Sequence, residues 1–121
     1  MHLLDGNNLS GFLWGDSRKR KPTLDLILDA YRGRRKRAIL VFDGPPDPAV
    51  PRERTVLGNV EVRLAVSGDA DALLAALARK HRGGLVVTAD TALASACRKA
   101  SAQTLTPREF IERLEQQNDA V

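Results

Sequence analysis

The chain has 121 residues, of which 43% are hydrophobic and 28% are charged, a composition typical of one globular domain and not of a disordered or fibrous protein. No apolar run approaches the roughly 20 residues that a membrane-spanning helix needs. The sequence also opens without a charged leader and an apolar stretch, so we expect a cytoplasmic protein with no membrane partner. The single cysteine, Cys97, excludes an intramolecular disulfide and a cysteine-based zinc cluster.

The positive charge is unevenly distributed. The formal net charge is +4, and nine of the 19 Lys and Arg residues lie between Arg18 and Arg37. These residues form either two solvated clusters beside a helix or an electrostatic footprint for phosphates. In the second case, added salt would weaken binding. The distribution alone leaves both interpretations open.

The N-terminal third begins with a short apolar strand. Leu3-Leu4 predicts the end of a buried parallel strand, and Gly6 allows the sharp turn that follows it. We predict a loop over residues 9–21. A helix is predicted from Pro22 to Tyr31, because apolar residues recur there at helical spacing.

The middle of the chain predicts two further strands. Residues 38–42 are a continuous apolar run, typical of a buried strand. The prolines that follow predict an irregular loop over residues 45–58. A third strand is predicted at 60–66, and a helix follows through Leu73 and Leu77.

The last third repeats this alternation. A fourth strand is predicted at 85–88, with a helix that starts beside Asp90 and turns Cys97 toward the core. A short strand is expected at 103–105. Residues 106–109 (TPRE) form a capping box with proline at the first helical position, which predicts the start of the last helix.

Strands therefore alternate with helices along the whole chain, without an internal repeat or a linker. This pattern is typical of a parallel sheet with right-handed crossovers and helices on both faces. We predict a single-domain three-layer α/β/α sandwich over residues 1–116, with a central, mostly parallel sheet of four or five strands. Residues 117–121 are predicted to form a polar C-terminal tail.

Aspartates follow all four strands: Asp5, Asp43, the pair Asp69 and Asp71, and Asp90. The carboxyl ends of parallel strands share one edge of a sheet, where open α/β sheets bind their ligands. The sequence therefore predicts that these carboxylates converge. The alternative is that each aspartate is a local turn or cap residue, since aspartate is favoured in both places.

Carboxylates held close together repel one another, so such a cluster needs a cation or raised pKa values. Oxygen ligands without a nearby His or Cys suit Mg²⁺ or Mn²⁺, and such a cation supports phosphoryl chemistry. Asn8 and Thr88 are expected beside the ligands, where they could hydrogen-bond a carboxylate or a water. His2 and His81 are assigned no catalytic role.

Five segments resemble, in order, the motifs of a known group. These are LLDGNNL at 3–9, VFDG at 41–44, GDADALL at 68–74, VVTAD at 86–90 and LTPREFIERL at 105–114. The pattern resembles the NYN domains of the PIN-like nuclease superfamily, and most of all the bacterial YacP-like branch.

The resemblance implies a PIN-like fold and a metal-dependent endoribonuclease. By that resemblance Asp5, Asp71 and Asp90 are the catalytic residues and hold Mg²⁺ or Mn²⁺, and Asp43 and Asn8 assist. Related YacP-like proteins act on RNA, some of them in connection with ribosomes.

The chain departs from the branch at three positions. A glutamate is common one helical turn after the Ala-Asp pair, where this chain has Ala75. A basic residue is common after the last aspartate, where Thr91 stands, and an expected glycine is Ser101. Asp69 is a candidate replacement for the missing acid and is therefore a further candidate ligand.

A single-stranded or loop RNA substrate would need cations near the acids. The residues expected to contact phosphates are Arg18, Lys19, Arg20, Lys21, Arg52, Arg54 and those at 32–37. Trp14 is interpreted either as a base-stacking residue or as a loop anchor packed on the domain.

Two other function classes stay open. A catalytically weakened NYN-fold module that binds RNA or the ribosome is favoured by Ala75. A Toprim- or phosphatase-like phosphotransfer enzyme is disfavoured, because no glutamate follows the first strand and no lysine stands near the last acids. No feature of the sequence indicates an oligomeric state.

Overall fold

The computed structural model describes residues 1–119, with side chains as far as Gln116. Its elements are β1 (His2–Asp5), α1 (Gly6–Trp14), α2 (Arg20–Tyr31), β2 (Ala38–Asp43), β3 (Arg54–Leu57), β4 (Val60–Ala65), α3 (Ala70–Lys80), β5 (Leu85–Val87), α4 (Thr91–Lys99), β6 (Gln103–Leu105) and α5 (Pro107–Asp119). The predicted tail at 117–121 is thus helical through Asp119, and its last two residues lie outside the described part.

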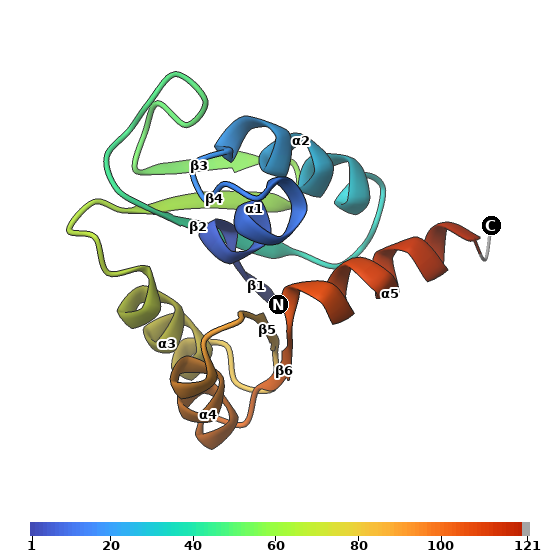
Figure 1. Cartoon of the computed structure of the whole chain (residues 1–121). Coiled ribbons are helices and arrows are strands. Elements are labelled where there is room, and N and C mark those ends of the chain that lie inside the picture. Colours follow the sequence, from blue (N-terminus) through green and yellow to red (C-terminus); the bar gives the residue numbers. More distant parts are fainter. Residues whose placement is uncertain (120–121) are drawn as a thin grey trace.

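The strands form one sheet in the order β3-β4-β2-β1-β5-β6 (Figure 1). All neighbouring pairs are parallel except β3 with β4. The predicted mostly parallel sheet is therefore confirmed, although it has six strands in place of four or five. The strand that the sequence analysis missed is β3.

Helices cover both faces of the sheet, as predicted (Figure 1). Side chains alternate along each strand, so Leu3 and Val41 pack with α3 and α4. Leu4 and Leu40 pack with α1, α2 and α5 on the other face. The result is a three-layer α/β/α sandwich.

The predicted loop at 9–21 is wrong for its first six residues, which complete helix α1. Asp5 caps this helix by accepting a hydrogen bond from the Asn8 amide. Leu9 has no exposed surface and joins the core. Burial of this leucine outweighs the low helix propensity of the glycines and asparagines around it, and Trp14 becomes the last residue of α1.

The predicted loop at 45–58 is also partly wrong, because it contains β3. This strand begins after the last proline of the segment, Pro51, and pairs antiparallel with β4, with Arg54 opposite Arg63. The Leu64 amide donates to the Glu53 carbonyl just before the strand. The prolines before β3 indicate a loop, so this edge strand of only four residues was not predicted.

The capping box of α5 is present as predicted. The Thr106 amide donates to the Glu109 carboxylate, and the Glu109 amide donates to the Thr106 hydroxyl. Among the described residues, no helix combines the length and the apolar character needed to cross a membrane.

Gly6 fixes the distance between the start of α1 and β2. A Cβ atom at this position would lie 2.5 Å from the Phe42 ring and 2.7 Å from the Val41 carbonyl oxygen. No side chain fits there without movement of the helix or the strand, so the glycine sets how closely Asp5 and the start of α1 approach β2.

We expect Gly6→Ala to lower the free energy of unfolding by about 2–3 kcal/mol, because the added methyl group overpacks the contact with Phe42. Gly11 lies in the same helix with nothing within 4 Å of the corresponding position. Gly11→Ala is the matched control and should stabilise the protein by about 0.5–1 kcal/mol. Urea unfolding of both variants measures the effects, and equal stabilities would contradict the prediction.

Candidate metal centre

Three of the predicted acids serve as helix caps. Asp5 accepts from the Asn8 amide at 3.2 Å, Asp69 accepts from the Ala72 amide at 2.9 Å and Asp90 accepts from the Leu93 amide at 2.8 Å. The cap interpretation therefore holds for these residues. It does not exclude a shared site, because each cap bond uses only one oxygen of its carboxylate.

Side chains alternate along the strands, and this alternation places Asp5 and Asp43 on one face of the sheet, at the carboxyl ends of its strands. The start of α3 lies on the same face. Asp5 and Asp43 follow Leu3 and Val41 by two residues, so they point toward the face that α3 and α4 cover. One carboxylate oxygen of Asp43 accepts from the Ala70 amide at 2.7 Å. The end of β2 is thereby tied to the first turn of α3, which also carries the exposed Asp71.

Asp5, Asp43, Asp71 and Asp90, here called the acidic cluster, interact electrostatically. The pKa of Asp5 is raised to about 6, mainly by burial and also by the charges of Asp71 and Asp43, against the opposing hydrogen bonds from Asn8 and Thr88. The pKa of Asp71 is also raised, first by burial and then by the neighbouring Asp90. The structure thus brings these carboxylates together, while Asp69 lies at the exposed margin.

Two asparagines connect β1 to the strands on either side. The side-chain oxygen of Asn7 accepts from the Asp43 amide at 2.7 Å, and that of Asn8 accepts from the Ala89 amide at 2.7 Å. The sequence analysis named Asn8 but did not assign a role to Asn7. The signal was its place beside Asn8 in a turn after a buried strand.

Thr88 lies at the centre of these contacts. Its hydroxyl is 3.1 Å from a carboxylate oxygen of Asp5 and 3.1 Å from the side-chain oxygen of Asn8. It also accepts a hydrogen bond from the Asp90 amide. Thr88 therefore links the end of β1 to the start of α4 and orients the buried carboxylate of Asp5.

The donor set of the acidic cluster suits a hard divalent cation, because it consists of carboxylate oxygens. Within the part of the chain that the structure describes, no three His, Cys, Asp or Glu side chains already stand in a metal-binding arrangement. Asp71 and Asp43 nevertheless lie close enough to raise the pKa of Asp5, and Asp90 lies close enough to raise that of Asp71.

Arg20 does not face solvent, although the sequence analysis placed it among the RNA-contacting residues. It is 9% exposed, and its guanidinium donates to the carbonyls of Asp43 and Pro45. It also pairs with Asp47 and lies over the Phe42 ring. Arg20 holds the end of β2 and is not available to a phosphate.

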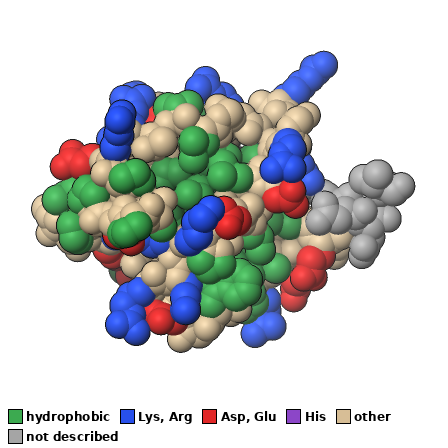
Figure 2. Space-filling model, turned by 90° about the horizontal axis from the view of Figure 1, so that it is seen from above, with side chains coloured by type: hydrophobic (Ala, Val, Ile, Leu, Met, Phe, Trp, Pro, Cys, Tyr) green, Lys and Arg blue, Asp and Glu red, His purple; other side chains and the backbone are tan. Residues whose placement is uncertain are grey.

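The other predicted basic residues near this edge are exposed. Arg18 pairs with Asp16, and Lys21 pairs with Asp25. On the face seen in Figure 2, Lys and Arg side chains stand in small groups that hydrophobic and acidic side chains separate. An RNA strand that crosses this face would meet no continuous basic track.

The two predicted basic groups lie at opposite edges of the sheet. The segment before α2 lies at the acidic edge, where the Asn7 amide group donates to the Ser17 carbonyl. Arg54 stands opposite Arg63, toward that same edge. Residues 32–37 instead precede Ala38, the first residue of β2, at the opposite edge. They lie too far from the acidic cluster to contact the same phosphates.

Two further features are the side chain of Trp14 and a hollow beside the acidic edge. The indole N–H of Trp14 donates to the Thr23 hydroxyl at 3.1 Å, and the side chain is 45% exposed. A hollow of about 550 Å³ lies beside the acidic edge, and Arg63, Ser67 and Asp69 contribute to its lining.

Comparisons with known proteins agree with this architecture. The sequence profile of the YacP-like NYN domain matches residues 15–121, a range that begins after Asp5 and includes the other members of the acidic cluster. No curated protein matches the chain significantly.

Among solved structures, the chain is similar to Rae1 (YacP) from Bacillus subtilis, at 20% identity and a TM-score of 0.70, with coverage of 99% of this chain and 76% of that chain. A tryptophan-to-leucine mutant of Rae1 gives 21% identity, a TM-score of 0.71 and coverage of 98% and 77%. These likenesses establish the fold. Because the profile match extends over most of its length, the chain belongs to the YacP-like NYN domain family, a nuclease-like family.

Proposed function

We propose that the protein is a metal-dependent endoribonuclease that hydrolyses phosphodiester bonds of single-stranded or loop RNA. The observation that supports this proposal is the acidic cluster, in which two carboxylates at strand ends (Asp5 and Asp43) and two at helix starts (Asp71 and Asp90) share one edge of the sheet. The carboxylates repel one another, and a bound divalent cation would neutralise their negative charge. Membership of a nuclease-like family supports the same chemistry.

Asp5, Asp71 and Asp90 are the residues that would hold Mg²⁺ or Mn²⁺. The oxygen of Asp90 outside its cap bond and the exposed carboxylate of Asp71 are both available to a ligand. We assign Asp43 and Asp69 a supporting part, because Asp43 ties the end of β2 to the Ala70 amide and Asp69 lies at the exposed margin of the cluster. A bound divalent cation activates water and neutralises charge at the phosphate.

The residues around the cluster keep its carboxylates in place. Thr88 hydrogen-bonds Asp5, and Asn8 fixes the turn that carries Thr88 and Ala89. Arg18, Lys19 and Lys21 beside the edge, together with Arg52 and Arg54, would contact the RNA phosphates, and Trp14 would stack a base. A cytoplasmic location would suit an RNA substrate and stays a prediction.

A second candidate function is a non-catalytic module that binds RNA or the ribosome. Ala75, where branch members often have a glutamate, packs against the hydrophobic cluster beneath α3 and offers no ligand. The lack of a preformed group of three metal-binding side chains among the described residues points the same way. The two functions differ in whether the acidic cluster is needed for cleavage or is only structural.

We expect Asp90→Asn to reduce Mn²⁺-dependent RNA cleavage by at least about 100-fold, because the amide can still cap α4 but cannot supply the negative charge. Asp5→Asn and Asp71→Asn should have the same effect, and EDTA should abolish cleavage by the wild type. Labelled RNA with Mn²⁺ or EDTA measures this loss.

Asp29→Asn is the matched control, because Asp29 is an exposed aspartate near the far end of α2, where it pairs with Arg32. It should cleave RNA like the wild type. Cleavage that survives both EDTA and Asp5→Asn would contradict the mechanism. RNA binding without any cleavage by the wild type would establish the second candidate function.

The stability of the metal-free protein should depend on the protonation of Asp5. The pKa of Asp5 is about 6 in the folded state, whereas the ordinary pKa of an aspartate is 3.8, so the folded state binds a proton that the unfolded state releases between these values. Stability is therefore lost as the pH rises through this window, by about 2–3 kcal/mol. The free energy of unfolding of Asp5→Asn should rise by this amount, relative to the wild type, from pH 4 to pH 7.

Urea unfolding in EDTA measures this difference, and a difference that does not change with pH would contradict the assignment. The comparison with the variant is necessary because His2 acts in the opposite direction. Its folded pKa is lowered to about 4, so it removes stability as the pH falls below about 6.5. His2 is present in both proteins, and its contribution cancels.

A further inference from the structure

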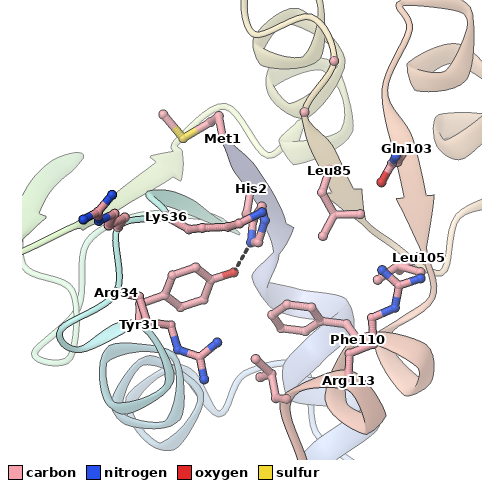
Figure 3. A pocket seen from close by; sticks show the side chains of 14 residues that line it. Met1, His2, Tyr31, Arg34, Lys36, Leu85, Gln103, Leu105, Phe110 and Arg113 are labelled. Carbon is pink, nitrogen blue, oxygen red and sulfur yellow. Dashed lines mark hydrogen bonds between the residues drawn. The ribbon is translucent and has the colours of Figure 1, made fainter. Parts of the chain in front are cut away.

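A second cavity lies at the opposite edge of the sheet from the acidic cluster. It has a volume of about 750 Å³ and opens between the start of β1, the segment after α2, and helix α5 (Figure 3). Residues 32–37, which the sequence predicted to contact RNA phosphates, lie at this edge. His2 precedes Asp5 by three residues of an extended strand, so the cavity is about 10 Å from the acidic cluster along β1.

The charge that lines this cavity has one sign. Arg34, Arg35 and Lys36 approach from the segment after α2, and Arg113 approaches from α5. Among the described residues that line the cavity, none is an aspartate or a glutamate. Within the described residues, none of Arg35, Lys36 and Arg113 forms an ion pair. The wall therefore carries an excess of positive charge that would attract an anion.

The floor of the cavity is apolar. Phe110 is nearly fully buried, and Leu105 and Leu114 are buried beside it. Figure 3 shows the Phe110 ring lying between Tyr31 and Leu105, with Leu85 above it. The exposed side-chain amide of Gln103 stands at the margin and can both donate and accept a hydrogen bond. A ligand for this cavity would combine an apolar body, a polar margin and a charged end.

The imidazole of His2, on one wall of the cavity, is kept neutral by its surroundings. His2 and Tyr31 share a hydrogen bond of 2.6 Å. Burial, with the charges of Lys36, the N-terminal amine and Arg34, lowers the pKa of His2 to about 4. The imidazole therefore adds no charge at neutral pH, and the long basic side chains are the cationic groups that face the cavity.

We propose that this cavity binds a nucleoside monophosphate, either free or as the 5′ end of an RNA strand. The base would cover the apolar floor at Phe110, the phosphate would lie between Lys36 and Arg113, and Gln103 would hydrogen-bond the edge of the base. Several cations suit a phosphate dianion better than a single carboxylate. The volume is within the range of pockets that take small organic ligands. This inference goes beyond the proposed function and does not depend on it.

The test is a calorimetric titration of the full chain with AMP in EDTA, so that no divalent cation links the phosphate to the acidic cluster. Adenosine, inorganic phosphate and octanoate are titrated in parallel. AMP should bind at least about tenfold more tightly than any of these. Only AMP has both a base to cover the apolar floor and a phosphate to contact the basic side chains. Saturation with AMP should also raise the pKa of His2 in an NMR titration, because the phosphate offsets the nearby positive charge.

Lys36→Gln combined with Arg113→Gln should weaken AMP binding by about 10- to 100-fold, through the loss of two charge-assisted contacts. Arg79→Gln combined with Lys80→Gln is the matched control. It removes the same charge from α3 without touching the cavity and should leave AMP binding unchanged.

Equal weakening by the two double variants would overturn the proposal, since it would indicate non-specific attraction. Tighter binding of octanoate than of AMP, or no saturable binding of AMP in EDTA, would also overturn it. Competition by a 5′-phosphorylated trinucleotide would assign the site to a strand end, whereas its failure to compete would assign the site to the free nucleotide. Because cleavage is measured separately with Mn²⁺, failure of this proposal is distinguishable from failure of the proposed nuclease function.

Discussion

The structure depends on like charges that are held together by main-chain amides. Asp5 is 3% exposed and lies among other carboxylates, which is unfavourable for an ionised group. The amides of Asn8, Ala70 and Leu93 offset part of this cost by donating to Asp5, Asp43 and Asp90. The hydrogen bonds that start the helices therefore also assemble the acidic cluster. Asp90, for example, caps α4 with one oxygen of its carboxylate and leaves the other oxygen outside that bond.

Rigidity at this edge comes from contacts between neighbouring strands. Asn7 binds the end of β2, and Asn8 binds the residue pair after β5, so the turn after β1 joins three strands. Gly6 lets this turn lie against Phe42, where any side chain would collide. The carboxylates of Asp5 and Asp43 are thus attached to a fixed frame, whereas Asp71 and Asp90 lie at the starts of α3 and α4.

Sequence reasoning succeeded where a local pattern and the fold agree. Apolar strands that end in aspartate, and the capping box at Thr106, are short-range signals that the structure retains. It failed at α1, where the burial of Leu9 outweighs weak propensities, and at β3, which follows a run of prolines. It also failed for Arg20, because its burial depends on groups more than 20 positions away along the chain.

Parallel topology explains why the two ends of the sheet differ in charge. Helices between parallel strands return in the opposite direction, so their amino ends meet at the carboxyl edge of the sheet and their carboxyl ends meet at the other edge. Because of the helix dipole, aspartates are favoured at the amino end of a helix and Lys and Arg residues at its carboxyl end. Helices α3 and α4 follow this rule, with Asp69 and Asp90 as caps and with Arg79, Lys80, Arg98 and Lys99 in their last turns.

The segment after α2 adds its basic residues to the cationic edge. An acidic edge and an opposite cationic edge are therefore two consequences of one chain topology. Under the two proposals, the protein would bind phosphates at both edges by different chemistry. At the acidic edge a phosphate would need a divalent cation as an intermediary, whereas at the cationic edge it would bind directly to Lys and Arg side chains. Dependence on divalent cations is thus the physical property that would separate the two proposed sites.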